Sequence, residues 1–191
     1  MIEKNRKTKE TDITLALDIY GAGDAEVSTG IGFFDHMLET LAKHALFDLK
    51  LTCKGDLAVD FHHSVEDCGI LLGAALNEAI YPAVGIERFA DRTAVLDESA
   101  VKCALDLGGR GFLNFAFKVE GKVGEFDSEL AEEFFRAIAI NAKIAAHFYL
   151  LSGENRHHII EAAFKAFALA MRAALTKNDR VRGAPSAKGV L

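Results

Sequence analysis

The sequence predicts an α+β protein built from two half-domains of the same design, each a mixed β-sheet with two helices on one face. A five-residue pattern, His-His-x-x-Glu, occurs at residues 62–66 and again at residues 157–161, half a chain away. Each half also shows the periodicities of strands, a helix, a strand and a helix in the same order. The pattern begins the last helix each time, so an internal duplication explains both observations.

In the first half, alternating and β-branched residues predict the strands, and apolar residues at helical spacing predict the helices. The expected strands are residues 12–20, 26–29 and 46–53, and the expected helices are 34–45 and 63–81. Pro82 ends the second helix, because proline cannot continue the hydrogen-bonded ladder.

The second half repeats this order. It is expected to contain strands at 92–96, 99–107, 112–119 and 148–151 and helices at 128–147 and 158–176. Gly108-Gly109-Arg110-Gly111 is expected to join the second and third of its strands as a hairpin. We place the two half-repeats at residues 1–86 and 87–191, together forming one compact unit. The polar tail from Lys177 is expected to be an ordered loop or a mobile end.

Composition narrows the range of functions. The 191 residues are 50% hydrophobic and 26% charged, which is typical of a globular protein. A net charge of −6 argues against nucleic acid as the main partner. Because the sequence has no long apolar run, we expect no signal peptide and no membrane span. Three widely spaced cysteines favour reduced thiols, so we expect a cytoplasmic protein.

The repeated pattern is suited to binding metal. His and Glu four residues apart share one helix face, whereas adjacent residues point about 100° apart. His62 and His63 are therefore expected to serve different ions, and Glu66 can pair with either. Each site then needs ligands from elsewhere, from the other half or from another subunit. Imidazole and carboxylate without thiolate suit Mn, Fe, Zn or Ni.

Other polar residues could complete such sites. His36 precedes the first copy of the pattern by nearly the same distance as Glu133 precedes the second, so both are candidate ligands. Arg88, Arg110 and the tail around Ser186 and Lys188 could bind an anion, since Arg suits phosphate and Lys supplies a point charge. Each of these charged residues is, taken singly, more often a plain surface residue.

Three readings of the pattern stay open on these grounds. The paired histidines could simply meet solvent or a carboxylate at a helix N-terminus, although two matched copies favour metal. A metal-storage or sensor protein would need the His and Glu residues but not the Arg and Lys set. A dinuclear metallohydrolase would need a metal-bound water facing a scissile bond.

Four motifs resemble those of the imidazoleglycerol-phosphate dehydratases. They are Gly32-Phe33-Phe34-Asp35-His36-Met37-Leu38, Asp60-x-His62-His63-x-x-Glu66-Asp67, Asn155-x-His157-His158-x-x-Glu161 and Ser186-x-Lys188-Gly189. The resemblance spans nearly the whole chain, from Arg6-x-Thr8-x-Glu10-Thr11 to Gly189, and the length matches the single-function form. It implies a duplicated fold like the second domain of ribosomal protein S5, in a shell of 24 subunits with active sites between subunits.

The resemblance also implies a reaction, a cofactor and residue roles. The reaction is dehydration of D-erythro-imidazole glycerol phosphate to imidazole acetol phosphate in histidine biosynthesis, with two Mn²⁺ ions per active site. Glu10 matches the acid/base glutamate. The matching metal ligands are His36, His62, His63, Glu66, His157, His158 and Glu161, with Glu133 where some members have His. The matching substrate contacts are Glu10, His36, His44, His62, Arg88, Arg110, Lys165, Ser186 and Lys188.

A mechanism consistent with these residues solves a chemical problem. The C2 proton of the substrate is not acidic enough for easy removal, so elimination needs an electron sink. An imidazolate that bridges two metal ions could help expel the C3 hydroxyl and give a diazafulvene-like intermediate. Glu10 is the favoured group for moving protons, with a metal-ligand Glu as its competitor.

Overall fold

The computed structural model describes residues 1–188, and in these residues the two halves contain the same elements in the same order. Gly189 of the C-terminal motif lies outside the described residues. The first half consists of β1 (Ile2–Lys7), β2 (Thr11–Asp18), β3 (Ala25–Ser28), α1 (Gly32–Ala45), β4 (Asp48–Gly55) and α2 (His62–Ile80). The second half has β5 (Phe89–Leu96), β6 (Ser99–Asp106), β7 (Phe112–Phe115), α3 (Leu130–Ala142), β10 (Ala145–Ser152) and α4 (Arg156–Ala174), with a small β8 (Lys122–Val123) and β9 (Phe126–Asp127) ribbon inserted before α3.

The strand pairing establishes the duplication. The two larger sheets have the orders β1-β2-β4-β3 and β5-β6-β10-β7. In both, the first two pairings are antiparallel and the last, β3 with β4 or β7 with β10, is parallel. Each parallel pair is joined through a crossover helix, as parallel strands require. The predicted α+β class and the repeated order of elements are confirmed.

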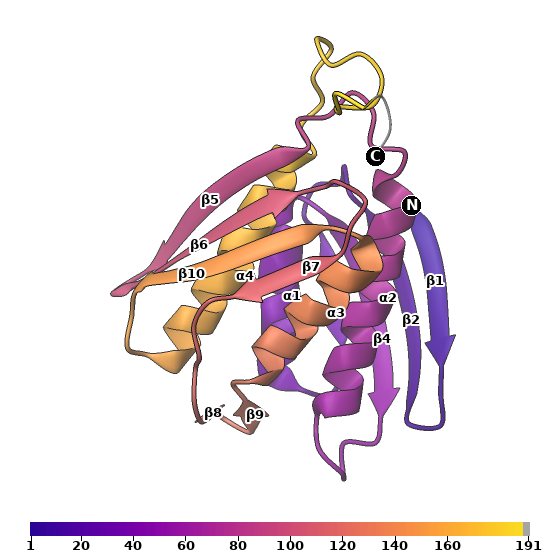
Figure 1. Ribbon diagram of the computed structural model, residues 1–191. Coiled ribbons are helices and arrows are strands. Elements are labelled where there is room, and N and C mark those ends of the chain that lie inside the picture. The colour runs from indigo at the N-terminus through magenta and orange to yellow at the C-terminus, as the bar shows by residue number, and fades with distance from the viewer. Residues whose placement is uncertain (189–191) are drawn as a thin grey trace.

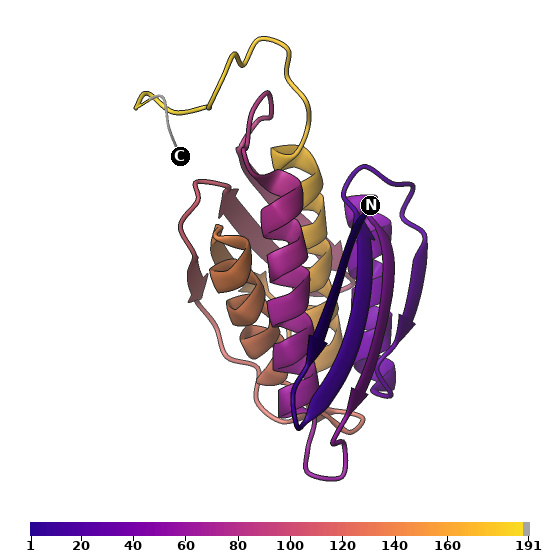
Figure 2. The ribbon, with the colours of Figure 1, turned by 90° about the vertical axis from the view of Figure 1, so that its right-hand side faces the viewer.

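The helices lie between the two sheets, so each sheet has two helices on its inner face (Figures 1 and 2). α1 packs against α4, and α2 packs along α3. Within the described part of the chain all four helices begin at the same end of the molecule, the lower end in Figure 1. The beginnings of α2 and α4, where the repeated pattern stands, are thereby brought to one end of the protein.

Two glycines allow α2 and α3 to approach closely. A Cβ atom at Gly69 would lie 2.8 Å from Cβ of Ala137, and one at Gly73 would lie 2.8 Å from Cβ of Asn141. These contacts advance together along both helices, so α2 and α3 run in the same direction. Buried phenylalanines fill the second half beneath its sheet, where Phe135 lies 4.5 Å from Phe148 and 4.7 Å from Phe164 between ring centroids.

Three sequence-based expectations about elements were wrong, and one strand was missed. β6 and β7 do not form a hairpin, because β10 lies between them and pairs with both. The helix expected over residues 128–147 covers only Leu130–Ala142, since Lys143 takes a left-handed conformation that ends it, and β10 begins at Ala145. The strand expected over residues 112–119 covers only Phe112–Phe115, and β1 was not predicted at all.

Residues 81–88 connect α2 to β5. The boundary between the two half-repeats, expected after residue 86, falls in this connection and stays a prediction. Among residues 1–188, the helices are all too short or too polar to cross a membrane. The tail after α4 runs alongside this connection at the upper end in Figure 1, where Asn178 N–H donates to the carbonyl of Gly85.

Candidate metal and active site

Both copies of the pattern begin helices whose first N–H groups bond to a preceding side chain, that of the N-cap Asn155 in α4 and that of Asp60, one residue before the N-cap, in α2. The amide oxygen of Asn155 accepts hydrogen bonds from the backbone N–H groups of His157 and His158 at the start of α4. At the start of α2, Oδ1 of Asp60 accepts from the N–H of His62 at 2.8 Å. Such caps satisfy backbone donors that the helix leaves free. They also fix the first turn, which carries the histidines.

The packing of α1 against α4 gathers three candidate ligands. Among residues 1–188, donor atoms of His36, His157 and Glu161 all lie within 4.8 Å of one another. Oε2 of Glu161 is 3.0 Å from Nε2 of His157 and 3.4 Å from Nε2 of His36, so both rings turn the same nitrogen toward one carboxylate. This geometry presents two imidazoles and a carboxylate to a common point.

The same carboxylate also contacts a lysine. Nζ of Lys165 lies 2.7 Å from Oε1 of Glu161. Burial alone would raise the pKa of Glu161, but hydrogen bonds from Lys165 and His157 outweigh burial, and the pKa is lowered. His44, two turns after His36 on α1, has a pKa lowered by burial and then by the positive charges of Lys165 and Arg172. Glu161 is therefore ionised and His44 neutral near pH 7.

The corresponding residues of the other helix pair are arranged less tightly. Nε2 of His62 is 3.9 Å from Oε2 of Glu66 on α2. Glu133 lies in the first turn of α3, and its Oε2 is 3.7 Å from Nε of Arg136. Because Gly69 meets Phe134 and Ala137, Glu66 and Glu133 both lie within the turn before this contact. The structure thus places Glu133 beside α2 but does not bring it into a three-ligand group within the described residues.

The second histidine of each pattern points away from the first. The rings of His62 and His63 have centroids 6.3 Å apart and cross at 88°, and those of His157 and His158 are 6.1 Å apart and cross at 81°. Nδ1 of His63 is 3.0 Å from Oδ2 of Asp56, and Nδ1 of His158 is 2.7 Å from Oε2 of Glu98. These directions support the expectation that adjacent histidines serve different ions.

The carboxylates beside these two rings shift their pKa values. The hydrogen bond to Asp56 raises the pKa of His63, with Glu10 adding a smaller effect. The hydrogen bond to Glu98 raises the pKa of His158, and the same bond lowers the pKa of Glu98 far below its usual range. Oε1 of Glu10 lies 3.7 Å from Nε2 of His63, on the side of the ring opposite Asp56.

The expected anion-binding residues lie at the other end of the helices. Arg88 makes two hydrogen bonds to Asp106, at 2.7 and 3.1 Å, and a third to the carbonyl of Pro185 in the tail. Its backbone N–H donates to the carbonyl of Ala174, the last residue of α4. Because His157 and Ala174 are separated by 17 residue steps of α4, this end is about 25 Å from the histidines.

The loop that carries Arg110 is at this same end. The N–H of Gly109 donates to the hydroxyl of Tyr81, which itself donates to the carbonyl of Lys143 after α3. Ser186 and Lys188 follow Pro185 in the tail, where the N–H of Lys188 donates to Oγ of Ser186. The histidines and the anion-binding residues of one chain are therefore too far apart to hold the same small molecule.

Comparison with known proteins identifies the family of this chain. Residues 29–171 match the family model described as imidazoleglycerol-phosphate dehydratase (IGPD). The chain is 64% identical to the imidazoleglycerol-phosphate dehydratase of Campylobacter hominis and 61% identical to that of Wolinella succinogenes, over 191 residues and the full length of each. The chain belongs to the imidazoleglycerol-phosphate dehydratase family. It is accordingly a dehydratase, a hydro-lyase, and the family's step belongs to histidine biosynthesis.

Solved structures support the same assignment. IGPD from Pyrococcus furiosus, crystallised in complex with (S)-C348, superposes with a TM-score of 0.84 at 33% identity, covering 98% of this chain and all of that one. Imidazoleglycerol-phosphate dehydratase from Staphylococcus aureus gives a TM-score of 0.82 at 35% identity, covering 93% and 100%. The duplicated fold of this chain is thus the fold of the family.

Several residues that shape the site were not predicted from the sequence. Asp56 and Glu98 orient histidines of the pattern, and Asp106 holds Arg88. A signal for Glu98 was available, since Asp97 and Glu98 form a charged turn between two strands, at the place that Lys9 and Glu10 occupy in the first half. Asp56 and Asp106 gave no signal that separates them from ordinary turn and strand-end carboxylates.

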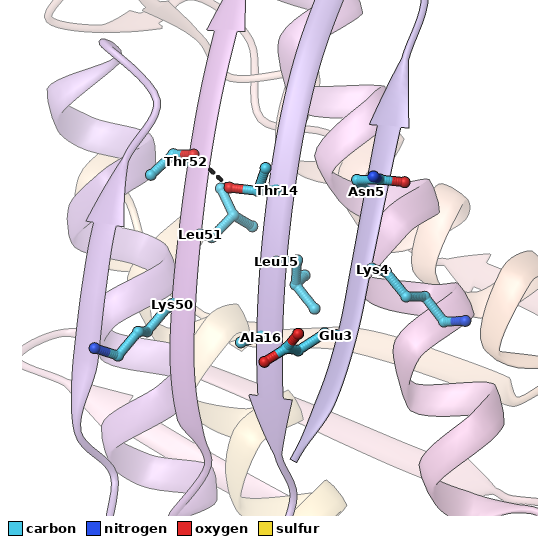
Figure 3. A pocket seen from close by; sticks show the side chains of 9 residues that line it. All are labelled: Glu3, Lys4, Asn5, Thr14, Leu15, Ala16, Lys50, Leu51 and Thr52. Carbon is cyan, nitrogen blue, oxygen red and sulfur yellow. Dashed lines mark hydrogen bonds between the residues drawn. The ribbon is translucent and has the colours of Figure 1, made fainter.

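One shallow pocket lies away from these residues, on the outer face of the first sheet (Figure 3). Its lining includes Asn5 of β1, Thr14 of β2 and Thr52 of β4, with a 2.7 Å hydrogen bond between the two threonine hydroxyls. The nine lining residues include no histidine and none of the predicted site residues. The pocket therefore offers none of the chemistry assembled at the helix ends.

Proposed function

We propose that this chain catalyses dehydration of D-erythro-imidazole glycerol phosphate to imidazole acetol phosphate in histidine biosynthesis, with two Mn²⁺ ions per active site. The observation that carries the proposal is the convergence of His36, His157 and Glu161 from α1 and α4 on one point. Family membership supplies the reaction, and this convergence supplies a place for one metal ion. The proposed location is the cytoplasm, where the buried Cys53, Cys68 and Cys103 remain reduced.

The donor set fits a hard or borderline divalent ion. Imidazole nitrogens and carboxylate oxygens without thiolate suit Mn²⁺ better than soft metals. His36, His157 and Glu161 would hold one ion, and Glu133, His62 and Glu66, their equivalents in the repeat, would hold the other. His63 and His158, which point outward, would complete sites of neighbouring subunits. When bound, the ions would supply Lewis-acid stabilisation of negative charge on the substrate's ring.

The chain's own residues would handle protons and position the substrate. Elimination would proceed through a diazafulvene-like form of the substrate, in which ring electrons expel the hydroxyl from the adjoining carbon. Glu10, beside His63, would move the protons that this step and the later ketone formation require. Arg88, Arg110, Ser186 and Lys188 would bind the phosphate and so fix the orientation of the ring. His44 and Lys165, near Glu161, would contact the substrate along α1 and α4.

We further propose that each active site is shared between subunits of a 24-subunit shell. The separation of about 25 Å along α4 supports sharing, because one substrate molecule must reach both the histidines and the arginine. The outer face of the second sheet offers a surface for assembly. Its exposed apolar residues, Phe89, Val95, Phe112, Tyr149 and Leu151, stand where the first sheet carries polar side chains.

An assay of the purified protein tests the reaction. Protein loaded with Mn²⁺ is incubated with imidazole glycerol phosphate, and the product is identified by mass spectrometry. The proposal expects imidazole acetol phosphate, lighter than the substrate by one water. Metal uptake without product would favour a storage or sensor protein, and release of inorganic phosphate would favour a metallohydrolase.

Mixed assemblies test the sharing of sites. Glu161→Gln removes a metal ligand, and Arg88→Ala removes the phosphate contact, so each variant alone should be nearly inactive. If one site takes its metal cluster and its arginine from different subunits, dissociating and reassembling the two variants together should restore activity. Activity no higher than that of the parent variants would reject sharing between these two groups. Reassembled wild type is the control for recovery.

A further inference from the structure

The outward-pointing histidines of the two patterns share a feature that the proposed ligand set does not include. Nδ1 of His63 lies 3.0 Å from Oδ2 and 3.3 Å from Oδ1 of Asp56. Nδ1 of His158 lies 2.7 Å from Oε2 of Glu98. In each half, therefore, the ring nitrogen nearer the backbone is bound to a carboxylate, and Nε2 is the nitrogen left for another partner.

A carboxylate at Nδ1 decides what the other nitrogen can do. An ionised carboxylate only accepts hydrogen bonds, so the ring must carry its proton on Nδ1. In the neutral ring Nε2 then has a free lone pair, which is the form that binds metal. Such a partner also fixes the plane of the ring and raises the basicity of the ligand nitrogen.

The carboxylate of Glu98 and the backbone of Asp56 are themselves held in place. Oε1 of Glu98 accepts hydrogen bonds from the N–H of Asn155 at 2.9 Å and from the hydroxyl of Ser99 at 2.9 Å, so Oε2 is left to face the ring. The backbone N–H of Asp56 donates to the carbonyl of Glu10 at 3.1 Å, and the carbonyl of Asp56 accepts from Val59. The carboxylate of Glu98 is therefore fixed by its own hydrogen bonds, and the backbone fixes the position from which Asp56 reaches His63.

The halves obtain this carboxylate from different places. In the second half it comes from Glu98, in the turn between β5 and β6. The corresponding turn of the first half carries Glu10, whose Oε1 is on the Nε2 side of His63. There Asp56 takes the Nδ1 position, from a β4–α2 connection (residues 56–61) that is longer than the β10–α4 connection (residues 153–155).

We propose that Asp56 and Glu98 are positioning residues that hold His63 and His158 in the Nδ1–H tautomer, with Nε2 presented to a metal ion shared with another subunit. The two equivalent turns then have different roles. Glu98 orients a ligand, whereas Glu10 faces the side on which the reaction would occur. The proposal deepens the proposed function and rests on it for the identity of the metal.

Glu98→Gln is the sharper of the two variants. The amide oxygen would stay with Asn155 N–H and the Ser99 hydroxyl, which turns the amide N–H₂ group toward His158. That group can only donate, so it would force the proton of the ring onto Nε2 and block metal binding there. Asp56→Asn should have a smaller effect, because both oxygens of Asp56 are near Nδ1 and the amide can present its oxygen after a flip.

Mn²⁺ titration of the metal-free protein in its native assembly, by calorimetry without substrate, measures the effect. Glu98→Gln should weaken binding of one of the two ions by about 10–100-fold and leave the other unchanged, the range typical for loss of such a partner. Glu154→Gln is the matched control, since it removes an exposed charge beside the start of α4 without touching His158. Unchanged Mn²⁺ affinity in Glu98→Gln would overturn the proposal.

The tautomer gives a second readout that does not depend on metal or on activity. Solid-state ¹⁵N NMR of the metal-free assembly, labelled at histidine, should show Nδ1–H signals for His63 and His158 above the pH at which the rings lose their charge. The His158 signal should change to Nε2–H in Glu98→Gln and stay unchanged in Glu154→Gln. If Glu98 had only a structural role, the His158 tautomer would be unchanged in both variants.

The two proposals can fail separately. If the wild type binds Mn²⁺ and forms product while both variants keep wild-type affinity and tautomers, the positioning roles are wrong and the function stands. If the wild type forms no product but Glu98→Gln loses metal affinity and changes tautomer, the positioning roles stand and the proposed reaction fails. Glu98→Asp, which keeps the charge but shortens the reach, should give an intermediate affinity and replaces Glu98→Gln if that variant does not assemble.

Discussion

Oε1 of Glu10 lies 3.7 Å from Nε2 of His63, the ring nitrogen that the hydrogen bond to Asp56 leaves available. Glu10 therefore lies beside Nε2 of His63, where a metal ion would bind. It leaves Nδ1 of the same ring to Asp56. It lies in the turn after β1, whose geometry Thr8 supports by accepting from the N–H groups of Glu10 and Thr11. A carboxylate at the edge of the proposed metal site is well placed to exchange protons with a bound substrate.

Glu10→Gln should abolish turnover while leaving binding nearly intact. The amide fills the same space but cannot take up a proton, and loss of a general acid or base typically costs about 10²–10⁴ in rate. We expect kcat to fall in this range, with Mn²⁺ content and the dissociation constant of a substrate analogue within a few-fold of wild type. Glu3→Gln, on the preceding strand β1, is the control. Near-normal kcat in Glu10→Gln would reassign the proton transfer to another group.

Glu133 is the test of the second metal position. This chain offers a carboxylate at this position, in the first turn of α3. Glu133→Gln should reduce bound Mn²⁺ from two ions per chain to one, measured by elemental analysis after dialysis, and Glu133→His should keep two. Glu132→Gln, which alters the neighbouring carboxylate and its pairing with Arg136, should also keep two. Two ions in Glu133→Gln would remove Glu133 from the ligand set.

Arg88→Lys should weaken substrate binding without loss of metal. Lysine keeps the charge but not the planar fork that binds Asp106 through two nitrogens and can bind phosphate in the same way. A hydrogen bond to a charged group contributes about 1.5–3 kcal/mol, so KM should rise by about one to two orders of magnitude. Arg92→Lys, which alters an exposed arginine of β5, is the matched control. A wild-type KM in Arg88→Lys would place the phosphate elsewhere.

The candidate ligands could be predicted from the sequence because their chemistry follows from residue type and helical spacing. His and Glu at i and i+4 face one way, and His157 with Glu161 does so in the structure. The partners that orient them could not be predicted, since the contacts of Asp56 and Glu98 depend on how loops fold back onto helix ends. Nor could spacing reveal that Arg88 is a helix length away from His157 in the same chain.

The same division holds for the fold. Long segments with clear periodicity, such as α2 and α4, were predicted within one or two residues of their bounds. β1 was missed because Ile2 is the only apolar residue in Ile2–Lys7, an edge strand exposed on one side. The pairing of β7 with β10 was missed because Gly108–Gly111 predicts a tight turn equally well when the chain leaves for a different neighbour.

Asp48 should give a stability contribution that depends on pH. Backbone N–H groups of Asp24 and Ala22, and then Gly23, donate to its Oδ1, and these hydrogen bonds lower the pKa of Asp48 below its usual value of about 3.8. Because the folded pKa is the lower one, this stabilisation is complete above the unfolded pKa and is lost as pH falls through the folded value. Asp48→Asn should therefore melt below wild type at pH 7, and the two melting temperatures should converge below pH 3.8. A difference that is constant with pH would show that the charge is not involved.

Gly69→Ala tests the close packing of α2 against α3, which sets where Glu66 and Glu133 lie. The added methyl would meet Cβ of Ala137 at 2.8 Å and the carbonyl oxygen of Phe134 at 3.0 Å, distances too short for carbon, so the helices must separate. Alanine favours a helix by about 1 kcal/mol over glycine, but overpacking of this kind costs about 1–3 kcal/mol. We expect a net loss of stability in urea unfolding, together with weaker Mn²⁺ binding at the site that α2 and α3 form. Gly32→Ala at the start of α1, where a Cβ would meet nothing within 4 Å, should be neutral or stabilising. If Gly69→Ala is as stable as Gly32→Ala and binds Mn²⁺ normally, the approach of α2 to α3 does not determine the site.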